Sequence, residues 1–214
     1  GSGGDHSVAH HVFGLDDAFF ASGRLVNLSS VHSSLVAFLA LPDALDHTVV
    51  LSAFDHEEVG SESRSGASGS FLSDVLTRIS GDAAVRLQAF AGSWFLSADA
   101  GHAVHPNYPD RFDPANHPVV GGGPLLKINA NQRYATDALG AAEWSRACES
   151  VGVPFQEFVS NNAIPCGSTI GPLTATRLGI RTVDVGLPLL SMHSARELAG
   201  AADPELFARA IGAF

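Results

Sequence analysis

The chain has 214 residues, 45% of them hydrophobic and 16% charged, which is typical of a globular domain with a substantial core. A formal net charge of −10 without a basic stripe argues against a nucleic-acid partner. No apolar stretch reaches the length of a membrane span, no signal peptide opens the sequence, and two cysteines give no disulfide framework, so we expect a cytoplasmic protein that does not enter the membrane.

The N-terminal part is expected to begin as a loop and continue as a helix. Residues 1–4 (GSGG) are typical of a linker or cloning scar, so the predicted domain covers residues 5–214. Residues 5–23 resemble a loop that carries three scattered histidines, His6, His10 and His11. Histidines can bind metal, but we favour no metal-binding role for these three. Apolar residues then recur at helical spacing over 25–41, which predicts a helix packed on a sheet: Leu28, Val31, Leu35, Phe38 and Leu39.

An apolar run at 49–54 (VVLSAF) predicts a short buried strand that leads into the charged stretch 55–61 (DHEEVGS). Ionisable groups at the end of a buried strand are costly unless something uses them, and ligands of open α/β sheets bind at that end. A solvated acidic loop is the alternative. The Gly/Ser-rich residues 60–70 fit no P-loop spacing, so we favour a flexible loop there over a phosphate-binding loop.

Predicted helices and strands alternate through the rest of the chain. The expected helices are 71–79, 83–92, 137–150, a helix that ends near 178 with Gly179 as its cap, one that begins at Ala195, and 204–214. The expected strands are 94–98, 125–129, 154–159 and 181–186. This alternation predicts an α/β fold with a mainly parallel central sheet covered by helices on both faces.

Acidic and histidine side chains follow several of the predicted strands: Glu57 and Glu58, Asp99, and His193. Mixed carboxylate and imidazole ligands suit zinc, manganese or cobalt. Two adjacent glutamates can divide the work, because one can hold a metal while the other acts as general base. Lys127 interrupts an apolar strand, where a lysine usually extends to solvent but can instead hold an anion.

Five motifs occur in an order and wording that closely resemble the aspartyl-aminopeptidase family of zinc metallopeptidases. They are 55–61 (DHEEVGS), 97–109 (SADAGHAVHPNYP), 131–136 (NQRYAT), 165–172 (PCGSTIGP) and 192–197 (MHSARE). The resemblance covers nearly the whole chain from about Phe20. It implies a two-metal, usually zinc, enzyme that removes an N-terminal residue, typically an acidic one, from peptide substrates.

The resemblance also implies a role for each matching residue. Glu57 would be the general base and Tyr134 would stabilise the tetrahedral oxyanion. Among the substrate-binding residues, Lys127 would meet the acidic side chain and His105 would lie beside the site. The metal ligands would be Glu58 and His193 for one ion and Asp99 for the other.

Two departures from the family pattern change what we expect of this chain. Residues 24–28 read Arg-Leu-Val-Asn-Leu where the family has Arg-Leu-Asp-Asn-Leu, and that aspartate bridges the two metals. Val26 has no ligating atom, so at most one zinc, weakly held, is expected. The family's N-terminal segment, with another histidine ligand and several strands, has no counterpart here, nor has its inserted oligomerisation domain. The sheet should therefore be incomplete on its N-terminal side.

These departures support an alternative to an active aminopeptidase. The chain would then be a catalytically impaired or truncated module of the family that binds metal or peptide without hydrolysis. An incomplete sheet exposes an edge that must be covered, so we expect a homo-oligomer or a complementing chain as partner.

Overall fold

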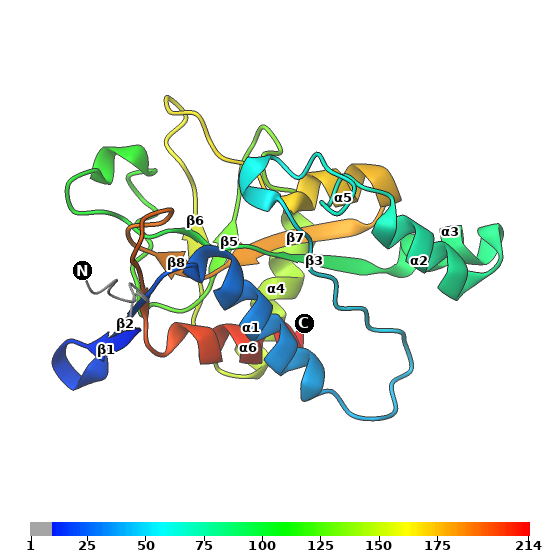
Figure 1. Cartoon of the computed structure of the whole chain (residues 1–214), viewed down its shortest axis with the longest axis horizontal. Coiled ribbons are helices and arrows are strands. Elements are labelled where there is room, and N and C mark those ends of the chain that lie inside the picture. The colour runs from blue at the N-terminus through cyan, green and yellow to red at the C-terminus, as the bar shows by residue number, and fades with distance from the viewer. Residues whose placement is uncertain (1–9) are drawn as a thin grey trace, which may run out of the picture.

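A computed structural model describes residues 10–214 (Figure 1). The proposed linker and His6 lie outside the described residues. The central sheet has the strand order β3-β7-β5-β6, with β3 at Trp94–Ala98, β7 at Arg181–Gly186, β5 at Leu125–Lys127 and β6 at Gln156–Phe158. β3 runs parallel to β7 and β5 parallel to β6, whereas β5 and β7 are antiparallel. The sheet is thus mixed, with two of its pairings parallel.

Helices cover both faces of this sheet. On one face, Val183 and Val185 of β7 pack in a hydrophobic core with α4 (Ala138–Ser150) and α6 (Asp203–Ala213). The largest side chains of this core are Trp144 from α4 and Phe207 from α6. On the other face α5 (Ile170–Leu178) packs so closely that a Cβ at Gly171 would meet the carboxylate of Asp184. Alternate residues of one strand therefore face different helices, as a two-sided sheet requires. The predicted α/β class is confirmed.

Two smaller sheets flank the central one. β4 (Gly101–His102) runs parallel to β8 (Pro188–Leu189), just beyond the ends of β3 and β7. An antiparallel sheet joins β1 (His11–Phe13), β2 (Phe19–Ser22) and β9 (Glu197–Gly200). Figure 1 shows this second sheet at the opposite end of the molecule from α2 (Phe71–Ser80) and α3 (Ala83–Gly92). Among residues 10–214, no helix is both long and apolar enough to cross a membrane.

Most of the predicted elements are present with slightly different ends. The helices expected at 71–79, 83–92, 137–150 and 204–214 correspond to α2, α3, α4 and α6. Asp137 accepts a hydrogen bond from the Gly140 amide at the start of α4, and Gly179 ends α5 in a left-handed conformation, with φ 67°. These local signals explain why the boundaries could be predicted.

The predicted buried face of the first helix is wrong. The helix exists as α1 (Leu25–Leu39), but its buried residues include Ser29, Ser30, Ser33 and Ala37. The predicted apolar stripe is exposed instead: Leu28, Val31, Leu35, Phe38 and Leu39. The reason is that α1 packs on α6, where small side chains allow a close approach, and the Ser33 hydroxyl donates to the carbonyl of Pro204 at 3.0 Å.

Three other local predictions are wrong. Residues 49–54 form no strand, because the structure shows no backbone hydrogen bond from them to any residue of 10–214, and Val49, Val50 and Leu51 are exposed. The loop expected at 5–23 contains the β1–β2 hairpin in its described part. The helix expected from Ala195 is instead strand β9, because pairing with β2 outweighs its local helical pattern.

Candidate active site

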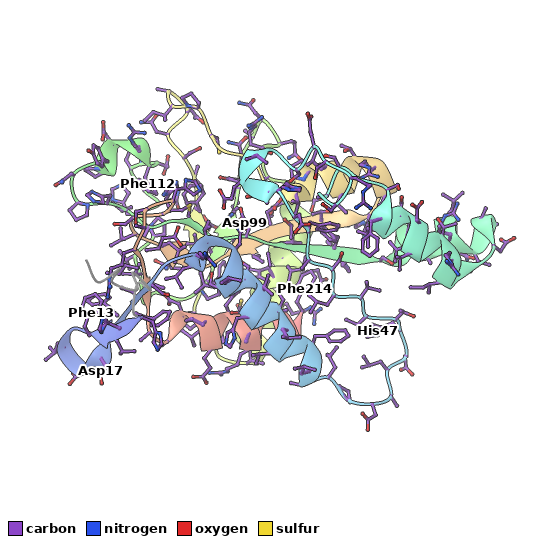
Figure 2. The ribbon with its side chains drawn as sticks, viewed as in Figure 1. Phe13, Asp17, His47, Asp99, Phe112 and Phe214 are labelled. Atoms are coloured by element: carbon purple, nitrogen blue, oxygen red, sulfur yellow. The ribbon has the colours of Figure 1, made fainter. Side chains whose placement is uncertain are left out.

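One pocket of about 610 Å³ contains every candidate site residue named from the sequence. Its lining includes Glu57, Glu58, Asp99, His105, Lys127, Tyr134 and His193. Figure 2 places Asp99 near the middle of the molecule, where β3 ends. The volume lies in the range of small-molecule and peptide-end sites. Segments far apart in sequence therefore converge on one hollow beyond the strand ends.

A tight turn presents the two glutamates to this pocket. Glu57 and Glu58 begin the single-turn 3₁₀ helix η2 (Glu57–Val59), which lies between left-handed residues, His56 with φ 62° and Gly60 with φ 100°. The Ser61 amide donates to the His56 carbonyl at 2.8 Å, which closes the turn. A non-glycine residue in the left-handed region is strained, and such strain is common at functional sites. The turn replaces the strand end that the sequence predicted.

Glu58 is held between two partners. Its Oε2 lies 2.9 Å from Nε2 of His193, and its Oε1 accepts a hydrogen bond of 3.0 Å from Nδ2 of Asn27. His193 was named as a candidate from the sequence, whereas Asn27 was not. The only sequence signal for Asn27 was its place beside Val26 in the altered segment 24–28.

Glu57 differs from its neighbour because its carboxyl group is partly buried. Burial, followed by the negative charges of Asp99 and Glu58, raises the pKa of Glu57 from 4.5 to about 7, although Lys127 opposes the shift. A carboxyl group with a pKa near neutrality can both accept and release a proton under ordinary conditions. Paired titratable groups with different environments commonly mark acid–base sites.

Lys127 forms an ion pair with Asp99. Its Nζ lies 3.0 Å from Oδ2 of Asp99 and donates a second hydrogen bond of 2.8 Å to the carbonyl of Ala100. The lysine is only 2% exposed, so it does not extend to solvent as a lysine usually does. Its Nζ also lies 5.4 Å from the centre of the Tyr134 ring. The cation is thus fixed inside the pocket wall.

Tyr134 is buried beside this lysine, on the loop that precedes α4. Burial and a hydrogen bond with the Cys166 thiol raise the pKa of Tyr134, so its hydroxyl stays protonated and can donate. The loop is anchored by Asp184, whose Oδ2 accepts from the amide of Ala135 at 2.6 Å and whose Oδ1 accepts from the Thr169 hydroxyl at 2.6 Å. Burial raises the pKa of Asp184, while those two hydrogen bonds oppose the shift.

Other residues complete the pocket lining. Nδ1 of His105 accepts a hydrogen bond from the Asn107 amide at 3.1 Å, and its ring packs on Tyr108 at 5.2 Å. Val26 contributes an apolar side chain to the pocket. His102 was given no role from the sequence, yet it also lines the pocket, and its ring meets that of His193 edge to face at 6.4 Å. Desolvation and the nearby His193 lower the pKa of His102.

The described side chains do not form a complete metal site. Within residues 10–214, no group of three or more histidine, cysteine, aspartate or glutamate side chains is arranged to hold a metal ion. Glu58 and His193 do converge, but Asp99 faces Lys127. The residues present therefore fit a zinc ion only in part.

The fold that surrounds this pocket is that of the α/β aminopeptidases. The family described as Aminopeptidase I zinc metalloprotease (M18) matches residues 5–214, and the chain belongs to that family. A probable M18 family aminopeptidase 2 from Streptomyces avermitilis is 54% identical over 217 residues, covering 98% of this chain and 50% of the relative. Aspartyl aminopeptidase 4 from Saccharomyces cerevisiae is 45% identical, covering 94% of this chain and 44% of its own length.

Solved structures agree with this assignment. The chain matches a structure described as the Ape4 and Nbr1 complex, with a TM-score of 0.89, 38% identity, and coverage of 96% of this chain and 41% of that one. It also matches the mApe1 dodecamer of S. cerevisiae, with a TM-score of 0.83, 29% identity, and coverage of 96% and 47%. The chain thus spans about half the length of the relatives it matches.

Proposed function

We propose that this chain is part of a metal-dependent aminopeptidase that removes N-terminal residues, preferentially acidic ones, from peptides. One observation carries the proposal: all seven candidate residues, six from four of the family motifs and Lys127 from β5, line a single pocket in a chain of the M18 family. The name of the yeast aspartyl aminopeptidase supports the acidic preference.

The roles we propose follow the chemistry of each side chain. Glu57 would act as general base, because its pKa of about 7 lets it take a proton near neutral pH. Tyr134 would donate a hydrogen bond to a developing oxyanion, because its hydroxyl remains protonated. Lys127 would attract the carboxylate of an acidic N-terminal residue, which would have to displace the Asp99 carboxylate from the Lys127 ammonium group. His105 would line the substrate side of the pocket.

We propose zinc as the metal, as the name of the family indicates, with manganese or cobalt as substitutes. Glu58 and His193 would provide the first two ligands, and Asp99 a third once it leaves Lys127. Val26 supplies no donor atom where the family pattern has an aspartate. At most one weakly held ion is therefore proposed.

The second candidate function is a module of the same family that binds metal or peptide without hydrolysis. Val26 and the incomplete ligand set favour it. So do the exposed apolar side chains of residues 49–51 and of one stripe of α1, which we together call the apolar surface. Its members are Leu28, Val31, Leu35, Phe38, Leu39, Val49, Val50 and Leu51.

We propose that the apolar surface binds a complementing polypeptide. Residues 49–54 form neither helix nor strand and have no backbone hydrogen-bond partner within residues 10–214, so a strand added beside them would satisfy their hydrogen bonds. A second copy of this chain would be the other occupant, and the molar mass of the complex distinguishes the two.

We also propose a reducing, cytoplasmic location, which the two free cysteines, Cys148 and Cys166, support.

The decisive experiment measures zinc binding by calorimetry together with hydrolysis of peptides that begin with Asp or Glu. It compares the chain with its Val26→Asp variant. Zinc-dependent release of acidic residues by either form supports the aminopeptidase. Zinc binding without hydrolysis in both supports the non-catalytic module, and no zinc binding in either contradicts every metal-based role.

A further inference from the structure

We propose that Glu197 is a positioning residue that aligns both partners of Glu58. Glu197 begins β9 and is only 1% exposed. Its Oε1 accepts a hydrogen bond of 2.7 Å from the amide of His193, and its Oε2 accepts one of 2.9 Å from the amide of Val26. One buried carboxylate therefore joins two segments that lie far apart in the sequence.

The first of these segments is the start of α1. Its N-cap residue, Arg24, is left-handed with φ 64° and makes no side-chain cap hydrogen bond. The first amides of a helix lack partners within the helix, and a carboxylate is favoured at that end by the helix dipole. Glu197 supplies this acceptor to Val26. The next residue, Asn27, donates its side-chain hydrogen bond to Glu58 at 3.0 Å.

The second segment is the loop that carries His193. His193 is left-handed with φ 65°, and Ser191 nearby is left-handed with φ 55°. Non-glycine residues keep this conformation only where the surroundings impose it. The hydrogen bond to Glu197 restrains the His193 backbone, and the imidazole of the same residue lies 2.9 Å from Glu58.

Glu58 thus takes its two partners from the two segments that Glu197 connects. Glu197 does not line the pocket, so it acts only through them. Its significance for metal binding rests on the proposed function, whereas its effect on Glu58 and His193 is a matter of geometry. The two can be tested separately.

The test is Glu197→Gln, which keeps the size of the side chain but leaves only one acceptor oxygen for two amides. Glu58→Gln serves as reference, because it alters the pair with His193 directly. Asp203→Asn is the matched control. Asp203 is likewise a buried carboxylate that accepts from three backbone amides, those of Gly121, Gly123 and Gly200, and it lies outside the pocket lining.

The primary readout is the His193 imidazole signal in a histidine-selective NMR spectrum at constant pH. We expect Glu197→Gln to move this signal in the same direction as Glu58→Gln and to speed amide exchange at Val26 and His193 about tenfold or more. Asp203→Asn should do neither. An unchanged His193 signal in Glu197→Gln, or an equal change in Asp203→Asn, overturns the proposal.

The unsubstituted protein provides a second test that does not depend on a variant that folds. The amides of Val26 and His193 should exchange slowly, although His193 lies on an exposed loop. Fast exchange at either amide contradicts the hydrogen bonds to Glu197.

Zinc calorimetry on the same variants separates this inference from the proposed function. Loss of a residue that orients a ligand typically weakens metal binding by about tenfold or more, so we expect that loss in Glu197→Gln and not in Asp203→Asn. If even the unsubstituted chain binds no zinc, the proposed metal site fails, while the NMR result still decides the positioning role. If zinc binds equally well to Glu197→Gln and to the control, Glu197 has no effect on the ligands.

Discussion

Lys127 and Asp99 form a nearly buried ion pair in the lining of the pocket, with 3.0 Å between Nζ and Oδ2. The pair joins the end of β5 to the residue that follows β3. Because Lys127 also donates to the carbonyl of Ala100, two hydrogen bonds fix its ammonium group. A residue proposed to bind metal and a residue proposed to bind substrate are therefore in contact with each other.

This contact predicts the effect of removing the lysine. Lys127→Met leaves Asp99 without its ionic partner in a largely buried setting, so the free energy of unfolding should fall by about 3 kcal/mol. Urea unfolding at neutral pH measures the change. Adding Asp99→Asn to the variant should recover part of the loss, and no recovery would mean that packing of the lysine chain, not its charge, stabilises the fold.

The raised pKa of Glu57 predicts a pH dependence of stability. The folded protein binds this proton more tightly than the unfolded chain, whose carboxyl has a pKa of 4.5 against about 7 when folded. The contribution of Glu57 to stability is therefore complete below about pH 4.5 and is lost as pH rises to about 7. Glu57→Gln removes this dependence, so the variant should gain stability relative to the parent at about pH 8 and not at about pH 4. Exposed Glu149 provides the control, since Glu149→Gln should show no such difference.

Val26→Asp should have opposite effects on zinc affinity and on stability. The new carboxylate would enter a pocket that already contains Glu57, Glu58 and Asp99. Repulsion should destabilise the metal-free protein, whereas an added ligand should strengthen zinc binding by about tenfold or more. Calorimetry and thermal unfolding, each with and without zinc, measure the two effects. Val26→Asn is the matched control, because it adds a polar group without a charge; equal zinc affinity in both variants would contradict a ligand role at this position.

The hydrogen bonds that Asp184 accepts predict that it stabilises the loop carrying Tyr134. Asp184→Asn offers one acceptor oxygen where the Thr169 hydroxyl and the Ala135 amide now use two. We expect a loss of about 2 kcal/mol in the free energy of unfolding and faster amide exchange at Ala135. Asp46→Asn, at an exposed position, should change neither. Unaltered exchange at Ala135 would show that other contacts position the loop.

The apolar surface predicts an effect on association without an effect on the fold. Leu51→Ser changes an exposed side chain, so the free energy of unfolding should change by less than about 0.5 kcal/mol. Light scattering should then show less self-association, or weaker binding of a complementing polypeptide, than in the parent. Ser substitution at exposed Leu15, which is outside that surface, is the control. Equal association in both variants would exclude residues 49–51 from the interface.

Several features of this protein were determined by local sequence. The period of apolar residues and the caps at Asp137 and Gly179 set where α4 begins and α5 ends, because these signals act within one turn of a helix. The apolar run at 94–98 and the alternating stretch 181–186 (RTVDVG) likewise predicted β3 and β7. The motifs also named six of the candidate residues that the fold brings to one pocket, and the position of Lys127 in an apolar strand named the seventh.

Contacts between distant segments decided the rest. The apolar stripe of α1 predicted one buried face, but close packing on α6 selected the face with small residues. Residues 49–54 have the composition of a strand, yet a strand requires a neighbour that donates and accepts its hydrogen bonds. The pairing of Lys127 with Asp99, and the connection that Glu197 makes between His193 and Val26, depend on which chain segments meet in space. No local sequence pattern specifies these long-range contacts, so only the tertiary structure could reveal them.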